Sequence, residues 1–271
     1  ALGSGRAALE DLEVIWRQTP KVGGRGHYGH RIAFGPDGYL FISSGERQKF
    51  DPAQDMQANL GKVIRLNEDG SVPADNPFAG HEDPRVLREI WAYGFRNPHR
   101  MAWDPVNNYR MMVTDIGEAN LEEINIVEKG GDYGWPNREG TYGISTLKDL
   151  KRVFRLPESD KSLYNNPYVQ YDHQQGYAIS GGHVYQGSIQ ELKNKYIFGD
   201  IVNGRLFYVN IDKPLTDSII YEIIVMNKGK TTSLSEMTQT SRLHLRIAYD
   251  HHSQELYIIT KSDGRIRRVA R

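Results

Sequence analysis

The chain has 271 residues, with 34 basic and 34 acidic side chains and no net formal charge at pH 7. This balance excludes a strongly basic nucleic-acid-binding surface, so we expect a small molecule or another protein as the partner. The absence of cysteine excludes disulfides and thiolate metal sites, and the remaining oxygen and imidazole ligands favour hard cations such as calcium. No apolar run approaches the roughly 20 residues that span a bilayer.

Three segments share one plan, in which an apolar-Ala-aromatic triplet and a polar turn lead into an apolar strand. They are residues 32–43, 101–114 and 247–260. Each predicts a β-hairpin, because the turns carry Pro-Asp-Gly, Asn-Asn or His-Ser between alternating apolar residues. A looser fourth copy covers residues 184–209.

Repeated hairpins with glycine and aromatic punctuation predict an all-β fold, and we favour a β-propeller of four-stranded blades. A β-sandwich is the alternative, because any all-β protein produces similar hairpins. Only residues 9–17 and 147–153 look compatible with a helix, and the first of these is equally compatible with a strand. The polar stretch at about 137–166 is interpreted as an insertion over one face of a single domain covering residues 1–271.

His27 is the first candidate for chemistry, because it lies directly before the first hairpin between Gly26 and Gly29. An imidazole exchanges a proton near neutral pH, and the flanking glycines let the backbone approach a ligand closely. A hydrogen-bonded loop histidine is the alternative.

Arg96 and Asn97 precede the second hairpin as His27 precedes the first. Loops in front of the same strand of successive blades lie at the same end of a propeller, so these three side chains could converge. A guanidinium binds a carboxylate or quinone oxygen with two donors, and an amide can donate and accept beside it. A surface ion pair is the alternative for Arg96.

Residues 115–125 and 130–136 are rich in oxygen ligands, with Glu122 and Glu123 beside glycine-containing loops. Calcium takes six to eight oxygens from carboxylates and carbonyls, so a calcium site is one interpretation. The spacing is not that of an EF-hand, and a solvated acidic loop is the other interpretation.

Taken together, these residues resemble the glucose/sorbosone dehydrogenase family, soluble six-bladed propellers that oxidise sugars with pyrroloquinoline quinone (PQQ) and calcium. The resemblance extends from about Leu12 to the C-terminus. The motifs that carry it are GHYGHRI (26–32), LGKVIRLN (60–67), DGSVPADNPF (69–78), YGFRNP (93–98), EIN (123–125) and YGWP (133–136).

The resemblance implies a role for each matching position in the oxidation of an aldose to its lactone. His27 matches the base that removes the proton of the C1 hydroxyl while hydride passes to the quinone. Arg96 and Asn97 match residues at the cofactor and substrate. The remaining matches are Gly117, with Glu118 beside it, at the calcium that polarises the quinone, Glu123 and Tyr133 at a structural calcium, and His244 and Arg246 at cofactor-binding positions.

Three departures fall at the cofactor site. Glu118 replaces the proline of a Gly-Pro pair, His244 replaces the first arginine of an Arg-x-Arg pair, and a lysine expected near Phe198 is missing from the sequence Asp200-Ile201-Val202. A propeller that binds a glycan or a protein without quinone is therefore an alternative, and a calcium-dependent lactonase is a weaker one.

The resemblance also implies an exported protein, periplasmic or secreted, that passes electrons to an external acceptor. In the family the base-bearing motif follows further blades, whereas only 26 residues precede His27. We therefore expect that N-terminal blades of the propeller are missing from this chain.

Overall fold

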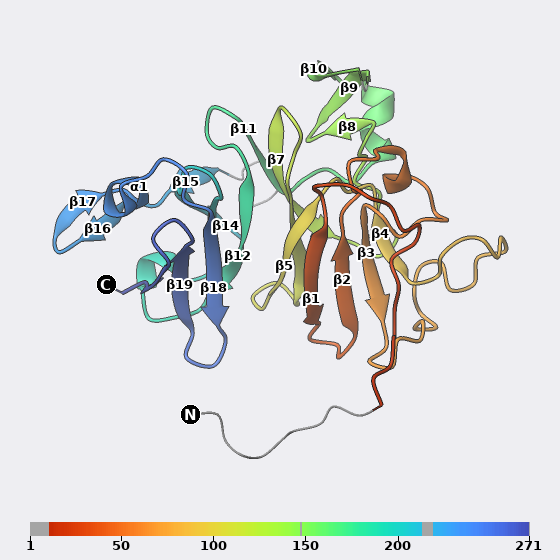
Figure 1. Cartoon of the computed structure of the whole chain (residues 1–271), viewed down its shortest axis with the longest axis horizontal. Helices are drawn as coiled ribbons and strands as arrows, with labels where there is room; N and C mark the ends of the chain where they lie inside the picture. Colours follow the sequence, from red (N-terminus) through yellow and green to blue (C-terminus); the bar gives the residue numbers. More distant parts are fainter. Residues whose placement is uncertain (1–10, 147, 213–218, 271) are drawn as a thin grey trace.

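The computed structural model describes residues 11–146, 148–212 and 219–270, and it is built almost entirely of antiparallel strands (Figure 1). Three sheets have four strands each and a fourth has three. In chain order they are β1 (Gly29–Phe34), β2 (Leu40–Ser44), β3 (Lys62–Leu66) and β4 (Ile90–Tyr93); β5 (Pro98–Asp104), β6 (Arg110–Asp115), β7 (Leu121–Val127) and β11 (Val169–Asp172); β12 (Ile179–Tyr185), β13 (Lys195–Asp200), β14 (Leu206–Asn210) and β15 (Ile220–Glu222); and β18 (Leu245–Asp250), β19 (Glu255–Thr260) and β20 (Arg265–Arg268).

Smaller elements connect these sheets. They are β8 (Arg138–Glu139), β9 (Tyr142–Thr146) and β10 (Asp149–Arg155), the hairpin β16 (Val225–Asn227) and β17 (Lys230–Thr232), the helix α1 (Leu234–Thr238), and the 3-10 turns η1 (Asp51–Ala53), η2 (Glu158–Leu163) and η3 (Gln190–Leu192).

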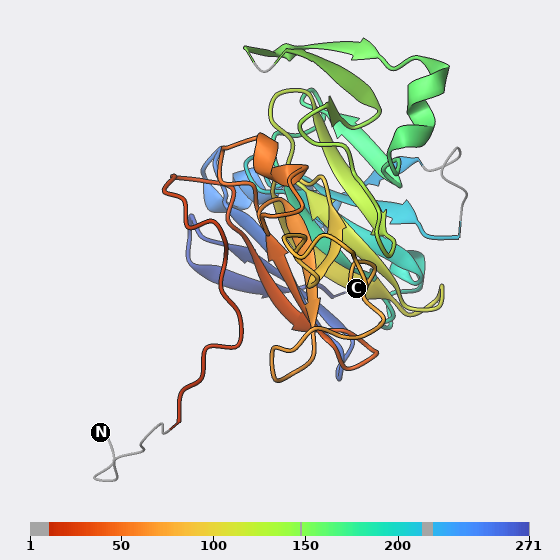
Figure 2. The ribbon, with the colours of Figure 1, turned by 90° about the vertical axis from the view of Figure 1, so that its right-hand side faces the viewer.

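The four sheets are successive blades of a propeller, as the sequence predicts. The first strand of each sheet contacts the first strand of the next, so that β1, β5, β12 and β18 lie side by side at the centre. The chain then runs outward through each blade before it returns to the centre (Figures 1 and 2). A total of six blades stays a prediction.

The three predicted hairpins are confirmed, and the strand register places equivalent residues opposite each other. Ala33 faces Phe41, Ala102 faces Met112, and Ala248 faces Tyr257. A small inner residue opposite a large one lets neighbouring blades approach closely, which explains the repeated apolar-Ala-aromatic triplet. The fourth, looser copy is also a hairpin, formed by β13 and β14.

Apolar side chains between the blades form the core. Val63 and Met101 belong to the cluster between the first two blades, Ile124 and Phe198 to the cluster between the second and third, and Leu245 to the cluster with the third and fourth. Each blade is therefore covered by its neighbour, which is how a propeller buries its sheets.

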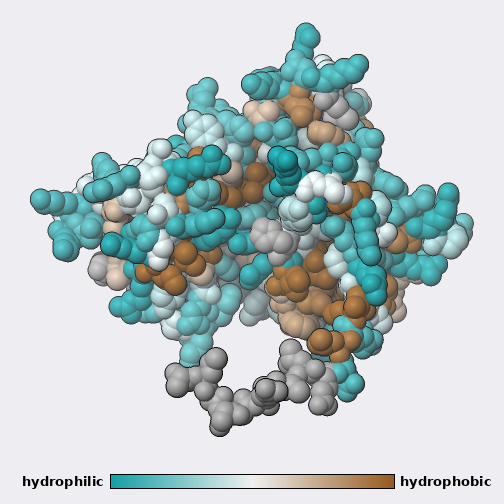
Figure 3. Space-filling view, viewed as in Figure 1, coloured by the Kyte–Doolittle hydropathy of each residue, from teal (hydrophilic) through white to brown (hydrophobic). Residues whose placement is uncertain are grey.

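The first blade also carries exposed apolar side chains. Ile32 and Phe34 on β1 are 62% and 59% exposed. Figure 3 shows brown apolar surface over this blade, next to the hydrophilic surface of its neighbours.

The helix predictions were wrong. Residues 12–17 form no helix, and residues 149–153 belong to β10, where Asp149 and Val153 pair with Thr146 and Ile144 of β9. Residues 9, 10 and 147 lie outside the described residues. The helix that does form, α1, begins at a capping box in which Ser233 and Glu236 accept each other's amide protons, a signature present in the sequence but missed.

The 137–166 stretch contains a small three-stranded sheet, β10-β9-β8, and lies between the third and fourth strands of the second blade (Figure 1, top). It touches the candidate site through Glu139, whose Oε1 accepts the amides of residues 118–121. No helix among the described ranges is long and apolar enough to cross a membrane.

Lys62 on β3 links the first blade to the 3-10 turn that follows β2 by hydrogen bonds. Its fully buried ammonium donates to the carbonyls of Pro52 at 2.6 Å and of Ala53 and Leu60 at 2.9 Å. Burial lowers the pKa of Lys62 to about 7, against the opposing effect of Asp55 and Asp132.

The buried ammonium predicts a pH-dependent stability. The pKa of Lys62 is lower in the folded chain than in the unfolded chain, so between about pH 7 and 10 the unfolded state binds more protons and stability rises with pH. We expect the free energy of unfolding in urea to rise by about 1–2 kcal/mol between pH 7 and 9, and this rise to vanish in Lys62→Met. The exposed Lys261→Met should keep the rise. An unchanged pH profile in Lys62→Met would contradict the assignment.

Candidate active site

His27 and Glu46 form a hydrogen-bonded pair at the end of the channel where β1 begins. The imidazole Nδ1 contacts Oε1 of Glu46, and the two side chains are 11% and 0% exposed. Burial alone would raise the pKa of Glu46, but the bond from His27 and the amides of Phe50 and Lys49 hold it below its usual value. An ionised carboxylate only accepts, so Nδ1 carries a proton, and in the neutral ring the lone pair is therefore on Nε2.

The loop after β2 is folded around the Glu46 carboxylate. The amides of Gln48 and Phe50 donate to it at 3.0 and 2.6 Å, and the Lys49 amide also donates to it. His27, Gln48 and Phe50 have left-handed backbone conformations, with φ of 53°, 59° and 62°. Such conformations cost about 1–2 kcal/mol per residue, so the carboxylate compensates for a strained loop.

The backbone of this loop lies against the chain that carries His27. The Arg47 amide donates to the His27 carbonyl at 3.2 Å. A Cβ at Gly45 would lie 2.1 Å from the same carbonyl oxygen, so only glycine fits there. The Arg47 guanidinium lies 3.4 Å from the centre of the Tyr28 ring and donates to the carbonyls of Gly24 and Gly26. The histidine is therefore fixed from its backbone as well as its ring.

Asn97 and Arg96 lie beside this pair, as the equivalent placement of their loop predicts. The Gly29 amide donates to Oδ1 of Asn97 at 3.0 Å, and the Glu46 amide donates to the Arg96 carbonyl at 2.9 Å. The first and second blades thus join directly at the candidate base.

Asp115 at the end of β6 sets the position of residues 96 and 97. Its carboxylate accepts the Arg96 amide at 2.9 Å and the Asn97 amide at 2.6 Å. Burial and the neighbouring Glu123 raise the pKa of Asp115 well above its usual value. The loop is therefore held by a carboxyl group removed from water.

Arg96 is engaged by other protein groups. Its Nε donates to Oε2 of Glu118 at 2.9 Å, its NH2 forms an ion pair with the same oxygen, and its NH1 donates to the Ile116 carbonyl at 2.8 Å. A ligand oxygen that binds the Nε and NH2 edge of this guanidinium must therefore replace or rearrange Glu118.

Gly117, the candidate carbonyl ligand of a catalytic calcium, lies between two carboxylates. Its amide is 3.4 Å from Oε2 of the buried Glu122, and Glu118 follows it in the chain. A Cβ at Gly117 would lie 1.8 Å from the Leu121 carbonyl oxygen, so the turn requires glycine. Burial raises the pKa of Glu122 to about 7, although a hydrogen bond from His173 opposes the shift.

The candidate structural calcium ligands, Glu123 and Tyr133, lie near a protein cation. The Arg138 guanidinium, 1% exposed, donates to the Tyr133 carbonyl at 3.3 Å and to Oδ1 of Asn166 at 2.9 Å. Burial raises the pKa of Glu123, and the charge of Arg138 opposes this shift most strongly. Arg138 thus supplies positive charge where the resemblance implies a metal.

His244 and Arg246 lie at the start of β18, in the fourth blade. Arg246 is partly buried, which lowers its pKa, and its NH1 donates to the Leu245 carbonyl at 2.8 Å. Within the described residues, no hydrogen bond joins either side chain to the group around His27. Hydrogen bonds therefore join His27, Arg96 and Asn97, with Gly117 and Glu118 reached through Arg96, and no such bond links His244 or Arg246 to this group in the described part of the chain.

The residues present suit the two implied cofactors unequally. Glu118, Glu122 and the Gly117 carbonyl offer the oxygen atoms that calcium prefers, and a cation would favour the ionised form of Glu122, which burial disfavours. No cluster of three or more His, Asp or Glu side chains arranged for a metal occurs in the described part of the chain. A site here would therefore rely on carbonyl oxygens. For an anionic quinone, the candidate cations are Arg246 and an Arg96 released from Glu118.

The fold and site define a β-propeller with a carboxylate-oriented histidine between two blades. The chain belongs to the glucose/sorbosone dehydrogenase family, whose model matches residues 2–269.

Individual relatives agree with the family assignment. Aldose sugar dehydrogenase YliI of Escherichia coli is 38% identical over 164 residues, which are 59% of this chain and 42% of that protein. Quinoprotein glucose dehydrogenase B of Acinetobacter calcoaceticus is 35% identical over 134 residues, 42% of this chain and 27% of that protein. The crystal structure of the soluble aldose sugar dehydrogenase from Escherichia coli in the apo form matches 96% of this chain and 69% of its own, with a TM-score of 0.75 and 26% identity. The chain spans less than half the length of these two curated relatives.

The sequence analysis missed Glu46, which the structure shows to be the partner of His27. The available signal was its place directly after β2, the strand that pairs with the strand following His27. A carboxylate that follows β2 lies at the same end of the blade as a side chain that precedes β1. This placement identifies Glu46 as a candidate partner of His27.

Arg138 provides a test of the buried charges. Replacing it with methionine removes the charge that most favours ionised Glu123, together with the hydrogen bonds to Tyr133 and Asn166, so we expect the free energy of unfolding to fall by about 3–5 kcal/mol. The exposed Arg152→Met should change it by less than about 0.5 kcal/mol. Urea unfolding measures both variants, and an Arg138→Met variant as stable as the parent would refute the charge pairing.

Proposed function

We propose that this chain carries the catalytic face of a PQQ- and calcium-dependent aldose dehydrogenase that oxidises sugars to lactones. The observation that carries the proposal is the hydrogen bond between His27 and the buried Glu46, next to Asn97. Membership of the family and the quinoprotein among the relatives support the choice of cofactor.

In this proposal His27 is the general base. Its Nε2 accepts the proton of the C1 hydroxyl while the C1 hydrogen leaves as hydride, which converts the hemiacetal carbon into a lactone carbonyl. Glu46 keeps the proton on Nδ1 and stabilises the imidazolium that forms. Asn97, whose Oδ1 is held by the Gly29 amide, lies where its amide group can contact a sugar hydroxyl or the cofactor.

PQQ, when bound, would supply the hydride acceptor, and calcium would polarise it as a Lewis acid. Arg96, Asn97 and Arg246 would hold the quinone, and the Gly117 carbonyl with Glu118 would hold the metal. Because Glu118 is the ion-pair partner of Arg96, binding of a cation by Glu118 would release the guanidinium for an oxygen of the quinone. We therefore expect calcium and PQQ to bind cooperatively.

The same proposal makes the substrate an aldose, the electron acceptor an external molecule, and the location periplasmic or secreted. Glu123 and Tyr133 remain the proposed ligands of a structural calcium, in competition with Arg138. Further blades supplied by an N-terminal segment would complete the propeller.

His27→Ala is expected to lower kcat by about 10²–10⁴ and to leave PQQ affinity within about threefold of the parent value, because the base acts only in proton transfer. Glu46→Gln should also lower kcat, because a neutral amide no longer fixes the imidazole tautomer. The exposed Glu82→Gln is the control. Dye reduction with a panel of aldoses measures the rates, and full activity in His27→Ala would refute the assigned base.

Calcium dependence is tested by PQQ titration before and after chelation. We expect the quinone absorbance to shift on binding to the calcium-loaded protein, and the affinity to fall at least about tenfold after chelation. In Glu118→Gln the calcium effect should shrink, because the carboxylate proposed to exchange Arg96 for calcium is gone. Equal PQQ affinity with and without calcium would contradict the proposed cooperativity.

A second candidate is a propeller that binds a glycan or a protein and holds no quinone. The engagement of Arg96 by Glu118 and Ile116 favours it, together with His244 at an expected arginine position. Failure of the calcium-loaded protein to bind PQQ, with the fold intact, would select this candidate, and tight PQQ binding would exclude it.

A further inference from the structure

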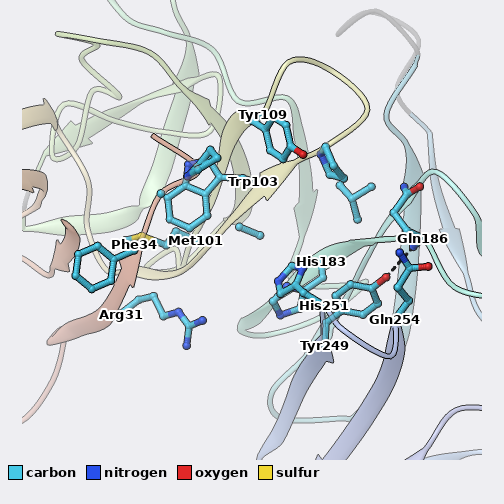
Figure 4. Close-up of a pocket in the computed structure, with 15 residues that line it drawn as sticks. Arg31, Phe34, Met101, Trp103, Tyr109, His183, Gln186, Tyr249, His251 and Gln254 are labelled. Atoms are coloured by element: carbon cyan, nitrogen blue, oxygen red, sulfur yellow. Dashed lines mark hydrogen bonds between the residues drawn. The ribbon is translucent and has the colours of Figure 1, made fainter. Parts of the chain in front are cut away.

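A cavity of about 340 Å³ lies in the central channel, apart from the His27 site (Figure 4). Its walls come from the inner strands of all four blades and from the turns that follow β1 and β5. His27, Arg96 and Asn97 are not among the residues that line it, and its lining residues from the first two blades lie toward the ends of β1 and β5 and in the turns that follow.

The cavity combines positive charge with unsatisfied hydrogen-bonding groups. Arg31 projects into it from β1, and His183 lies on the opposite side on β12 (Figure 4). Nε of Arg31 and Nδ1 of His183 are buried and have no hydrogen-bond partner. None of the lining residues has a carboxylate, and within the described residues no acidic side chain forms an ion pair with Arg31.

Two other blades also carry an arginine at the position of Arg31. Arg100 and Arg246 occupy the position of Arg31 in their own blades, directly before the repeated triplet. Burial, and then the charges of Arg246 and Arg31, lower the pKa of Arg100 to about 10. Like charges in a desolvated channel repel, and a bound anion would relieve that repulsion.

His183 is neutral in this setting and can donate one hydrogen bond. Burial, with His251, Arg31 and Arg100 nearby, lowers its pKa to about 3. Its ring stacks on Tyr249 with 5.7 Å between centroids, and His251 packs edge-on against Tyr249 at 5.1 Å. The Tyr249 hydroxyl accepts the Gln186 amide at 3.0 Å, so the aromatic group is held in place before any ligand arrives.

Most of the remaining wall is apolar or aromatic, and Gln186 and Gln254 are its polar members. Trp103 and Met101 come from β5, Phe34 from the end of β1, and Tyr109 from the turn after β5. An inorganic anion would leave these walls without contacts, whereas a planar apolar body would cover them. The cavity therefore matches a ligand with an aromatic ring and a negative charge.

We propose that this pocket is a second ligand site that binds a small aromatic carboxylate, with the carboxylate at Arg31 and His183 and the ring against Trp103 and Tyr249. The site is separate from the His27 centre and does not depend on the proposed sugar oxidation.

Calorimetry with benzene-1,3-dicarboxylate tests the proposal, with its uncharged dicarboxamide and inorganic phosphate as comparison ligands at equal ionic strength. We expect the dicarboxylate to bind. Both comparison ligands should bind at least about tenfold more weakly, because the dicarboxamide lacks the negative charge and phosphate lacks the aromatic ring. Equal affinity for the dicarboxamide, equal affinity for phosphate, or no binding of the dicarboxylate would overturn the proposal.

Variants locate the ligand. Arg31→Gln should weaken dicarboxylate binding by about ten- to a hundredfold, and the exposed Arg152→Gln should not change it. Tyr109→Ala removes a half-exposed wall residue with little risk to folding, and it should weaken the dicarboxylate but not phosphate. His27→Ala should bind the dicarboxylate as the parent does. Loss of binding in His27→Ala, or unchanged binding in a folded Arg31→Gln, would overturn the assigned location.

Discussion

The buried carboxylate of Glu46 is the constraint on which the candidate site depends. It accepts three amides of its own loop and the Nδ1 proton of His27, so one ionised group shapes a strained loop and fixes a ring. These bonds outweigh the burial, which alone would raise the pKa of the carboxyl group.

The same loop joins two blades. The Glu46 amide donates to the Arg96 carbonyl, and the Gly29 amide donates to the Asn97 side chain. The Asp115 carboxylate accepts the backbone amides of the same two residues. A propeller buries its sheets by apolar contacts between blades, which are not directional. The hydrogen bonds at this end of the blades are directional. The apolar core therefore sets the spacing of the blades, and the hydrogen bonds set the orientation of the site residues.

Much of the fold was predictable because the triplets and turns of the hairpins are local patterns. His27, Arg96 and Asn97 were also predictable, since equivalent loops of successive blades meet at one end. Glu46 can be selected only once β2 is paired with β1, and Arg138 was not predictable, because its partners depend on an insertion within the second blade. The 149–153 stretch shows the same limit, because pairing with β9 overrides its apparent helix compatibility.

The central claim is that Glu46 holds His27 as the Nδ1–H tautomer with a basic Nε2. Nitrogen-15 NMR of the histidine rings measures this directly, with the His27 signals assigned from their loss in His27→Ala. At a pH where the imidazole is neutral, the account predicts a protonated Nδ1 and an unprotonated Nε2 in the parent, and a mixture of tautomers in Glu46→Gln. A protonated Nε2 in the parent would contradict it.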